Sequence, residues 1–222
     1  GLAAGVRLTS NDMLHKGDWI TVKSVDANGI VEDLSLTTVK VRNFDNTIVT
    51  ISPATLVNGS FQNWIGMQKS GGRRVKRIVY FDFRSIRLVD ETLKQTLLAK
   101  HFATEDSFKL KETLQKAIEK DIQEGKDIED LKNPAALAPT NLQLYRKFME
   151  KYLRQRPEVN TELTLMVRHM EATQCGLPIE FYFFIKDKVW VNYEHILADI
   201  MEHAYALANE FGLKIYEQYP EQ

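Results

Sequence analysis

The sequence predicts an α+β protein in which a small SH3-like or Sm-like β-barrel domain is followed by a mixed α/β domain with a helical arm insertion. Three observations predict this class. Residues 17–64 form short alternating segments separated by turn residues, with no helical period. Residues 66–77 combine three glycines with five lysines and arginines, a composition typical of a connection. Beyond them, strand-like runs alternate with long amphipathic runs, as in an α/β domain.

The composition favours a folded protein of two domains. At 222 residues the chain exceeds the commonest single-domain size, and with 44% hydrophobic and 27% charged residues it can bury a core. A net charge of -1 gives no global field that would attract nucleic acid or an acidic membrane surface. The single cysteine, Cys175, cannot form an internal disulfide, which favours a reducing compartment.

The longest uninterrupted apolar runs are "GLAAGV" and "FYFFI". Both are far shorter than the roughly 20 apolar residues that a membrane-spanning helix needs. The start of the chain also lacks the charged and apolar regions of a secretory signal. We therefore expect that no segment of this chain crosses a membrane by itself.

The strands of the first domain can be followed along the sequence. Residues 18–25 alternate apolar and polar side chains, and Asn28-Gly29 predicts a hairpin turn because both residues accept positive φ. Residues 37–44 alternate again, Asp45-Asn46 predicts a second turn, and residues 47–51 give a further strand. Such a series of short strands favours a small curled sheet or barrel, which is more often a docking or structural module than an enzyme.

Helix and strand signals also order the second domain. Residues 75–83 predict a strand, and the helix over 89–102 has Asp90 as its N-cap. Residues 105–140 are charged, carry a narrow apolar seam and contain two prolines, so they predict an inserted helical arm. The remaining elements are a helix over 142–157, strands over 161–170 and 177–185, a helix over 192–212 with Gly212 as its C-cap, and a closing strand over 213–218.

Several stretches resemble the MscS family of mechanosensitive channels. The series "GDWITV", "GIVEDLSLTTVKVRNFDN", "VTI" and "LVNGSFQNW" is similar to the barrel domain of that family, and "GLAAGV" is similar to the cytoplasmic end of its pore-lining helix. "GMQKSGGRRVKR" and "FGLKIYEQYP" resemble the linker and C-terminal strand of the miniconductance branch. One departure is Ile51-Ser52-Pro53, where the proline comes one residue later than is common in the family.

The resemblance implies the cytoplasmic portion of a channel subunit, at the cytoplasmic face of the bacterial inner membrane, with the membrane helices N-terminal to Gly1. It implies a homo-oligomer, a ring of seven in characterised members, that encloses a vestibule with side openings. The implied partners are identical subunits, the lipid bilayer through those missing helices, and permeating ions, but no nucleic acid. Membrane tension would open the pore and protect the cell against osmotic downshock.

This resemblance also completes the division of the chain. The expected parts are a stub of the pore-lining helix at 1–12, the β-barrel domain at 13–65, a basic linker at 66–77, the α/β domain at 78–212 with its arm at 105–140, and a C-terminal strand and tail at 213–222. No catalytic residue, metal ion or cofactor is expected.

Two groups of candidate residues lie near the start of the chain. Ala3, Ala4 and Gly5 are small, as expected where the helices of neighbouring subunits pass close together. In this chain we expect residues 1–12 to be frayed, and a rigid helix packed on its own barrel would count against the assignment. Asp18 and Trp19 lie at the expected junction between membrane and ring, where Trp19 either anchors at the membrane interface or caps the barrel core.

The strongest local charge is a basic cluster in the linker. Its sharper interpretation is the attraction of anions near the side openings, and the simpler one is a hydrated linker that forms salt bridges with a neighbouring subunit. We prefer the simpler interpretation for any single arginine. The cluster consists of Lys69, Arg73, Arg74, Lys76 and Arg77.

Two alternatives belong to other classes of protein. One is an Sm-like RNA-binding module with a regulatory α/β domain, although the barrel segment has no clear row of stacking aromatic residues. The other is a metal-dependent hydrolase, because His195, Asp199 and His203 follow one another at helical i, i+4 spacing. They lie opposite the apolar stripe of their helix with no further ligand fixed by sequence, so we expect a solvated face. His169 within a strand and Cys175 without a partner predict structural roles.

Overall fold

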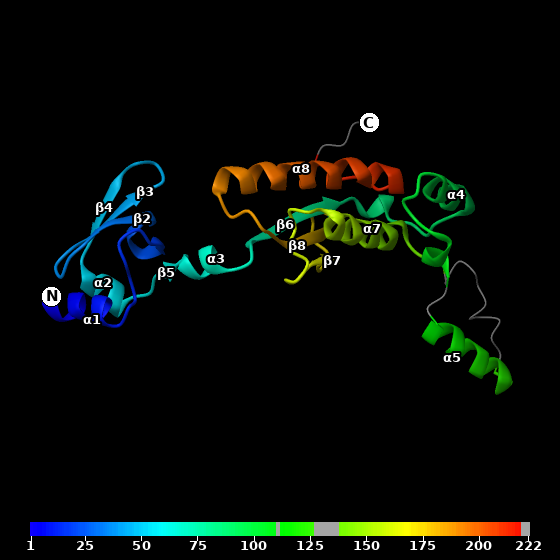
Figure 1. Cartoon of the computed structure of the whole chain (residues 1–222). Helices are drawn as coiled ribbons and strands as arrows, with labels where there is room; N and C mark the ends of the chain where they lie inside the picture. Colours follow the sequence, from blue (N-terminus) through cyan, green and yellow to red (C-terminus); the bar gives the residue numbers. More distant parts are fainter. Residues whose placement is uncertain (110–111, 127–137, 219–222) are drawn as a thin grey trace. The chain divides into compact units, whose positions relative to one another are not determined.

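The computed structural model describes residues 1–109, 112–126 and 138–218. The chain divides into two compact units, Gly1–Gly71 and Gly72–Gln222. The order of their elements along the chain can be followed in Figure 1. The division falls inside the segment predicted as a linker, but that segment is not structureless, because a short helix occupies its start and a strand its end.

The first unit contains an open antiparallel sheet of five strands in the order β4-β3-β2-β1-β5. The described strands do not close on themselves, so the predicted barrel is corrected to a curled open sheet, whose last strand has only two residues. The elements are α1 (Leu2–Ser10), β1 (Trp19–Val22), the 3-10 helix η1 (Lys23–Val25), β2 (Ala27–Leu34), β3 (Val39–Asn43), β4 (Ile48–Ile51), α2 (Pro53–Asn58), β5 (Gln62–Asn63) and α3 (Ile65–Lys69).

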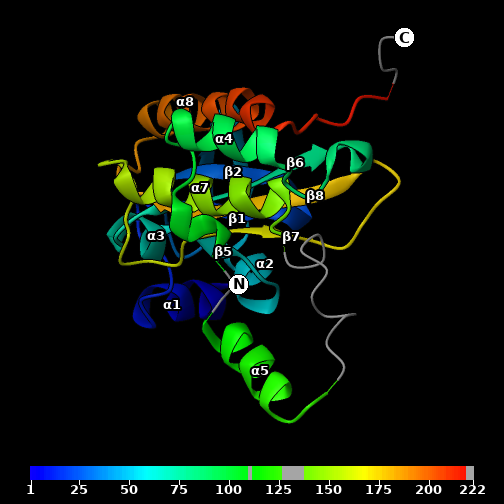
Figure 2. The same ribbon diagram turned by 90° about the vertical axis from the view of Figure 1, so that its right-hand side faces the viewer.

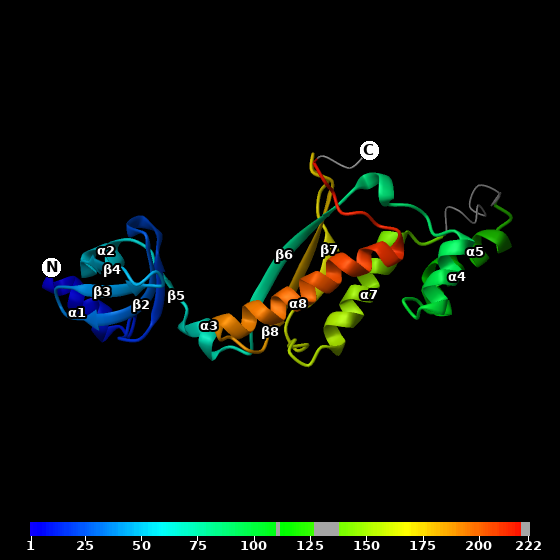
Figure 3. The ribbon, with the colours of Figure 1, turned by 90° about the horizontal axis from the view of Figure 1, so that it is seen from above.

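The core of this unit lies between the sheet and the two helices α1 and α2, which are close together in Figures 1 and 3. Ile20 and Val22 of β1 point into it, as the alternation predicts, and Leu8 of α1 and Leu56 of α2 cover it. Each of these four side chains is almost completely buried. Burial of such a side chain stabilises a fold by about 1.5–3 kcal/mol, so α1 is part of the unit.

The N-terminal helix therefore differs from the expectation. Residues 1–12 were expected to fray, whereas α1 is a helix packed on its own sheet. Gly5 is buried, and a Cβ atom there would collide with the carbonyl oxygen of Leu36 in the loop between β2 and β3. The prediction of fraying is wrong because Leu8 and Gly5 give the helix a docking face within the same chain.

The first hairpin also turns at a different place. Asn28-Gly29 lies within β2, and the chain reverses over η1 and Asp26, whose φ is +53°. Gly29 is required for another reason, since a side chain there would collide with the carbonyl oxygen of Arg42 on β3. The second predicted turn is confirmed, with Asn46 at a φ of +69° between β3 and β4.

The displaced proline has a local explanation. Ser52 is the N-cap of α2, with its hydroxyl accepting a hydrogen bond from the backbone N–H of Thr55, and Pro53 occupies the first helical position. Serine at the N-cap and proline at the next position are both preferred there, because proline has no N–H to leave unsatisfied. The sequence Ser52-Pro53 thus starts a helix.

The second unit is a sheet in the order β6-β8-β7 with helices against one face. Figures 2 and 3 show α7 and α8 running along it. Its elements are β6 (Arg73–Phe81), η2 (Phe83–Ser85), α4 (Glu91–Ala99), η3 (Glu105–Phe108), α5 (Glu112–Gln123), α7 (Asn141–Gln155), β7 (Met166–His169), β8 (Leu177–Ile185), α8 (Trp190–Ala208) and η4 (Asn209–Phe211).

Strand β8 is central, as its aromatic sequence predicts. Its residues Ile179, Phe181 and Phe183 are fully buried in the core that α7 and α8 cover, while Tyr182 and Phe184 alternate onto the opposite face. The strand predicted over 161–170 is shorter than expected, since only β7 pairs with β8 in a regular ladder. The overall class, α+β, is confirmed.

Local signals at helix ends are confirmed as well. The carboxylate of Asp90 accepts the N–H of Leu93 at 2.8 Å and caps α4, and Gly212 has a φ of +69° after α8 and η4. The closing segment forms one bridge, between Phe81 and Ile215, and not a regular strand. Part of the predicted arm and of the predicted tail, residues 110–111, 127–137 and 219–222, lies outside the described residues.

A buried asparagine joins three segments of the second unit. Asn141, at the start of α7, is fully buried. Its amide nitrogen donates to the carbonyl oxygens of Ser85 and Phe211 at 2.9 and 3.0 Å, and its side-chain oxygen accepts the N–H groups of Arg87 and Leu142 at 3.0 and 2.9 Å. All four hydrogen bonds that this amide can form to neighbours are made, so it fixes α7 against η2 and η4.

Candidate functional site

Asp18, predicted at the junction between membrane and ring, lies in the loop between α1 and the sheet and holds that loop. Asp18 is only 6% exposed. Its carboxylate accepts the backbone N–H of His15 at 2.9 Å and the side-chain amide of Asn63 on β5 at 3.0 Å. The loop after α1 is thereby tied to an edge strand of the sheet.

His15 adds a second tie within the same loop. One ring nitrogen contacts the carboxylate of Asp12, and the other lies 3.6 Å from the carboxylate of Asp18. The backbone of the loop is also hydrogen-bonded to β2. The N–H of Gly17 donates to the carbonyl oxygen of Val31 at 2.8 Å, and the N–H of Val31 donates to the backbone carbonyl oxygen of Asp18 at 2.8 Å. These bonds make the connection from α1 to β1 a fixed one.

Trp19 lies on the outer face of the sheet and does not cap the core. Its ring stacks on Trp64 with 4.4 Å between centroids, and Phe44 meets it edge-on at 5.5 Å. Its indole N–H donates to the side-chain oxygen of Asn28 at 2.8 Å. Ile20, the next residue, takes the place in the core. This aromatic group cannot be recognised in the sequence, because its members lie far apart along the chain.

The three small residues of α1 differ in their surroundings. Gly5 is small because the backbone of Leu36 in the same chain touches it. Ala3 is exposed and Ala4 is half-buried, so a neighbouring molecule could approach only these two. The exposed face of the helix also carries Leu2 and Val6, which are 62% and 48% exposed.

The basic cluster is divided between the two units and between two faces of a strand. Lys69 ends α3 in the first unit, and the other four residues lie on β6 in the second. Because side chains alternate along a strand, Arg73 and Arg77 point to the side of α8, and Arg74 and Lys76 point to the opposite face. The sequence therefore indicated the cluster correctly but not its division.

The two arginines near α8 have partners. The guanidinium of Arg73 lies over the ring of Tyr193, 4.5 Å from its centroid, and that of Arg77 lies 4.0 Å from the carboxylate of Glu194. Burial raises the pKa of the Tyr193 hydroxyl, which donates to the carbonyl oxygen of Arg74 at 2.7 Å. These contacts attach the start of α8 to the edge of β6.

On the opposite face, the cluster meets aromatic rings. Arg74 lies 5.9 Å from the centroid of Tyr182, and Lys76 is paired in register with the same residue. Both basic residues are exposed. This face of the sheet is positively charged at that end, and ions in solution can reach it, as they can reach the exposed residues Lys69 and Arg77.

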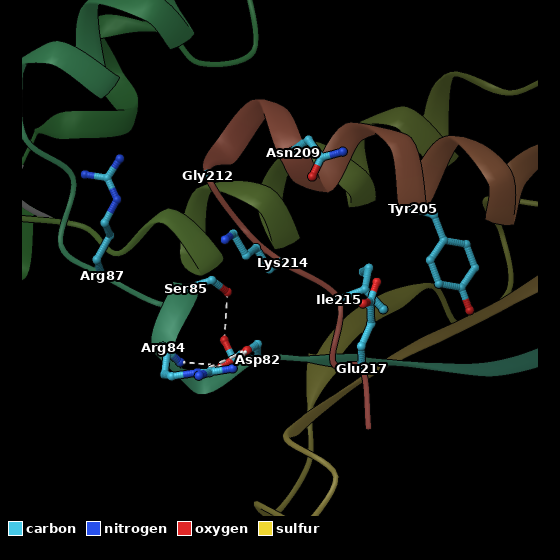
Figure 4. Close-up of a pocket in the computed structure, with 10 residues that line it drawn as sticks. All are labelled: Asp82, Arg84, Ser85, Arg87, Tyr205, Asn209, Gly212, Lys214, Ile215 and Glu217. Carbon is cyan, nitrogen blue, oxygen red and sulfur yellow. Dashed lines mark hydrogen bonds and ion pairs between the residues drawn. The ribbon is translucent and has the colours of Figure 1, made fainter. Parts of the chain in front are cut away.

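Sequence reasoning missed an open cavity of about 900 Å³ near the end of the chain (Figure 4). Arg84 is paired with Asp82 at 2.8 Å, and this hydrogen bond holds the pKa of the Asp82 carboxyl below its ordinary value. Lys214 comes from the closing segment, far from both along the sequence. The cavity is lined by Asp82, Arg84, Ser85, Arg87, Tyr205, Asn209, Gly212, Lys214, Ile215 and Glu217.

This cavity carries charges of both signs and opens to solvent. Its basic residues are largely paired, since Arg84 contacts Asp82 and Arg87 contacts Asp90 at 2.8 Å. In the sequence, the charged segment "FDFRSIR" is a local signal that could have indicated this cavity. The pairing of that segment with residues 213–217 could not have been foreseen, because it depends on the fold.

Comparisons with known proteins bear on the first unit directly. Residues 1–66 match the family described as "Mechanosensitive ion channel, beta-domain". These residues are therefore similar to the β-domain of mechanosensitive ion channels. The matched segment includes α1, the Asp18 junction and the aromatic group of Trp19.

The whole chain is similar in fold to two solved channel structures. A cryo-EM structure of Arabidopsis thaliana MSL1 matches 98% of the chain with a TM-score of 0.62 at 10% sequence identity. A crystal structure of Helicobacter pylori MscS in a closed state matches 100% of the chain with a TM-score of 0.58 at 12% identity. The chain spans 58% and 63% of the length of these two chains.

The resemblance to MscS-family channels is thus confirmed, by the β-domain match and by the fold of the remainder. The proteins matched are ion channels and not enzymes. Within the described residues, no helix combines the length and apolarity needed to cross a membrane.

The remaining candidates make only local contacts. On α8, His203 contacts the backbone oxygen of Asp199 at 2.7 Å and stacks on Tyr152. Among residues 1–109, 112–126 and 138–218, no group of three or more His, Cys, Asp or Glu side chains is arranged to hold a metal ion. Cys175 is exposed, in the turn between β7 and β8 and not at the end of a strand.

Proposed function

We propose that this chain is the cytoplasmic vestibule portion of a mechanosensitive channel subunit of the miniconductance branch, at the cytoplasmic face of the bacterial inner membrane. The match of residues 1–66 to the channel β-domain carries the proposal. The fold of the remainder, which is similar to that of two channel structures, supports it. The subunit performs no covalent chemistry.

The helix α1 is, in this proposal, the cytoplasmic end of the pore-lining helix. Its packing on its own sheet, which was expected to count against this assignment, is accepted because the match to the channel β-domain includes α1. It is fixed to the β-domain by Leu8 in the core, by the contact of Gly5 with Leu36, and by the carboxylate of Asp18 in the loop that follows. A helix held in this way moves with its β-domain when membrane tension favours the wider pore. The β-domain then transmits the movement of the pore to the ring.

Identical subunits assemble in this proposal into a cyclic ring, of seven copies, around a vestibule. Each copy brings the exposed pair Arg74 and Lys76, together with Lys69, so that a ring repeats the same positive charges around its axis. Repetition of like charges raises the local concentration of anions. These residues are therefore proposed to act on permeating ions. Opening of the pore is proposed to protect the cell against osmotic downshock.

The decisive experiment is electrical recording from the full-length protein in a membrane patch. Tension applied by suction is expected to open a channel, and replacement of Asp18 by Ala is expected to change the tension required, because the N–H of His15 and the amide of Asn63 lose their common acceptor. Asn replacement of Asp26, an exposed carboxylate in the turn after η1, is the control and is expected to leave the threshold unchanged, because asparagine tolerates the left-handed φ of that position. Absence of tension-activated current would contradict the proposal.

A second measurement is the mass of the particle formed by the full-length protein, obtained by light scattering. A mass near seven subunits agrees with the proposed ring. A monomeric or dimeric particle that binds RNA with steep salt dependence would instead support the RNA-binding alternative, because such dependence arises from phosphate contacts.

A further inference from the structure

A small cavity in the second unit lies beside the start of the predicted arm. Its volume is about 140 Å³, and it lies between α7 and the segment that joins α4 to η3. The two lysines that line it, Lys147 and Lys151, are exposed residues of α7. His101 also lines it. Three nitrogen-bearing side chains thus meet at one cavity.

No acidic side chain lines this cavity in the described part of the chain. The two carboxylates next to it along the sequence are already paired, Glu105 with Lys94 at 3.8 Å and Asp106 with Lys109 at 2.7 Å. Lys147 and Lys151 are four residues apart on one helix, and like charges at that spacing repel each other. An anion between them would remove this repulsion.

Two hydroxyl groups complete the polar side of the cavity. Thr104 and Ser107 line it and form a capping box at the start of η3, in which the oxygen of Ser107 accepts the backbone N–H of Thr104 at 3.0 Å. The two hydroxyl oxygens also lie 3.3 Å apart, so one hydroxyl donates to the other and the accepting one keeps its hydrogen for a ligand. The floor is apolar and rigid, since Phe102 and Phe148 pack edge to face at 5.1 Å.

The position of His101 is unusual for a residue with a side chain. It follows the C-cap of α4 at a φ of +61°, with its N–H bonded to Leu98 and the N–H of Phe102 bonded to Leu97. This is the pattern of a Schellman motif, in which glycine is the preferred residue at the left-handed position. A histidine at this position brings an imidazole to the edge of the cavity.

We propose that this cavity binds one tetrahedral oxyanion, a phosphate ion or a phosphoryl group, between η3 and α7. The donors are the ammonium groups of Lys147 and Lys151, the ring of His101 and one hydroxyl of the Thr104–Ser107 pair. Sites for drug-sized ligands and cofactors usually measure about 300–1,000 Å³, so a cavity of this size selects a single small group. The bound group joins the first turn of the arm to α7.

The test uses the full chain and inorganic phosphate. Thermal unfolding is measured at increasing phosphate and, separately, at increasing chloride of the same ionic strength. We expect phosphate to raise the unfolding temperature above the chloride value. In K147Q and K151Q, the affinity for phosphate measured by calorimetry is expected to fall by about tenfold or more, because each variant loses a charge-assisted hydrogen bond.

The matched control is R154Q, which removes a positive charge from an exposed position of the same helix but outside the cavity. It is expected to keep the phosphate response. H101G separates binding from folding, because glycine suits the left-handed conformation: the unfolding temperature without phosphate should not fall, while the response to phosphate should weaken. An equal response in K147Q, K151Q and R154Q, or no difference between phosphate and chloride, would overturn the proposal.

A second ligand distinguishes the source of the anion. Glycerol 3-phosphate presents the same phosphoryl group on a larger molecule. Binding of phosphate alone identifies a free ion as the ligand, and equal binding of both identifies the terminal phosphoryl group of a larger partner. If neither anion binds, the channel proposal is unaffected, because the channel proposal depends on the β-domain and is tested by electrical recording.

Discussion

At the scale of single residues, Gly5 decides how α1 is held. Helix propensity alone predicts that replacing Gly5 by Ala stabilises the chain, by up to about 1 kcal/mol. The structure predicts the opposite, because the added Cβ collides with the carbonyl oxygen of Leu36. We expect Gly5→Ala to lower the free energy of unfolding by about 1–3 kcal/mol in urea denaturation, as other overpacking substitutions do.

The control for Gly5→Ala is Ala3→Ser, at an exposed position of the same helix. It is expected to change the free energy of unfolding by less than about 0.5 kcal/mol, the usual range for exposed sites. Stabilisation by Gly5→Ala would show that the small residues serve contacts between subunits only.

In the second unit, Asn141 decides how α7 is held, as Gly5 does for α1 in the first. In Asn141→Asp, a carboxylate oxygen replaces the nitrogen that donates to the carbonyl groups of Ser85 and Phe211, so that two acceptors face each other without a hydrogen. We expect a loss of at least about 2 kcal/mol in chemical denaturation at neutral pH. Thr140→Ala, which removes only the N-cap bond of the same helix, should cost less, about 1 kcal/mol.

At the scale of elements, α4 gives a prediction for pH. The pKa of the Asp90 carboxyl lies below its ordinary value. The main cause is the hydrogen bond from the N–H of Leu93, and the paired Arg87 adds to it. A carboxyl whose pKa is lowered in the folded state stabilises the fold above its unfolded pKa, and this contribution is lost as the pH falls through the folded pKa. The cap of α4 should therefore weaken in acid.

The measurement compares the native chain with Asp90→Ala and Asp90→Ser by denaturation from pH 7 down to about pH 3. We expect Asp90→Ala to be the less stable chain at pH 7 and the difference to shrink as the pH falls. Asp90→Ser keeps a capping oxygen that does not titrate, so it should retain its stability relative to Asp90→Ala throughout. A difference that does not vary with pH would contradict this account of the cap.

The success of sequence reasoning at this scale depended on whether a signal was local. Asp90 and Gly212 were placed correctly because a cap is determined by the few residues beside it. Asn28-Gly29 was misplaced as a turn because the need for glycine comes from Arg42 on a neighbouring strand. Fraying of α1 was predicted wrongly for the same reason, since the residue that contacts Gly5 is thirty-one positions away along the chain.

The candidate site shows the same limit. The basic residues on β6 were identified from composition, and strand alternation then separates Arg74 and Lys76 from Arg73 and Arg77. No motif indicates the stacking of Trp19 on Trp64 or the cavity that His101 and Lys147 both line, because these arrangements arise only when distant segments are brought together. Motifs that act through tertiary contacts need the fold before they can be recognised.

At the scale of the whole molecule, the two units have separate cores. Buried residues of the first core all lie within positions 8–56, and those of the second all lie within 75–213. Cooperative unfolding follows the extent of a shared core, so each unit is expected to unfold as one cooperative body. Scanning calorimetry of the chain should then show two transitions.

The two residue substitutions assign these transitions. Gly5→Ala should lower the temperature of one transition and leave the other in place, and Asn141→Asp should do the reverse, because each acts on one core only. A single transition lowered by both substitutions would show instead that the units unfold together. Two transitions would also show that the contacts of α1 with its sheet do not depend on the core of the α/β domain, because the buried residues of that core lie within positions 75–213.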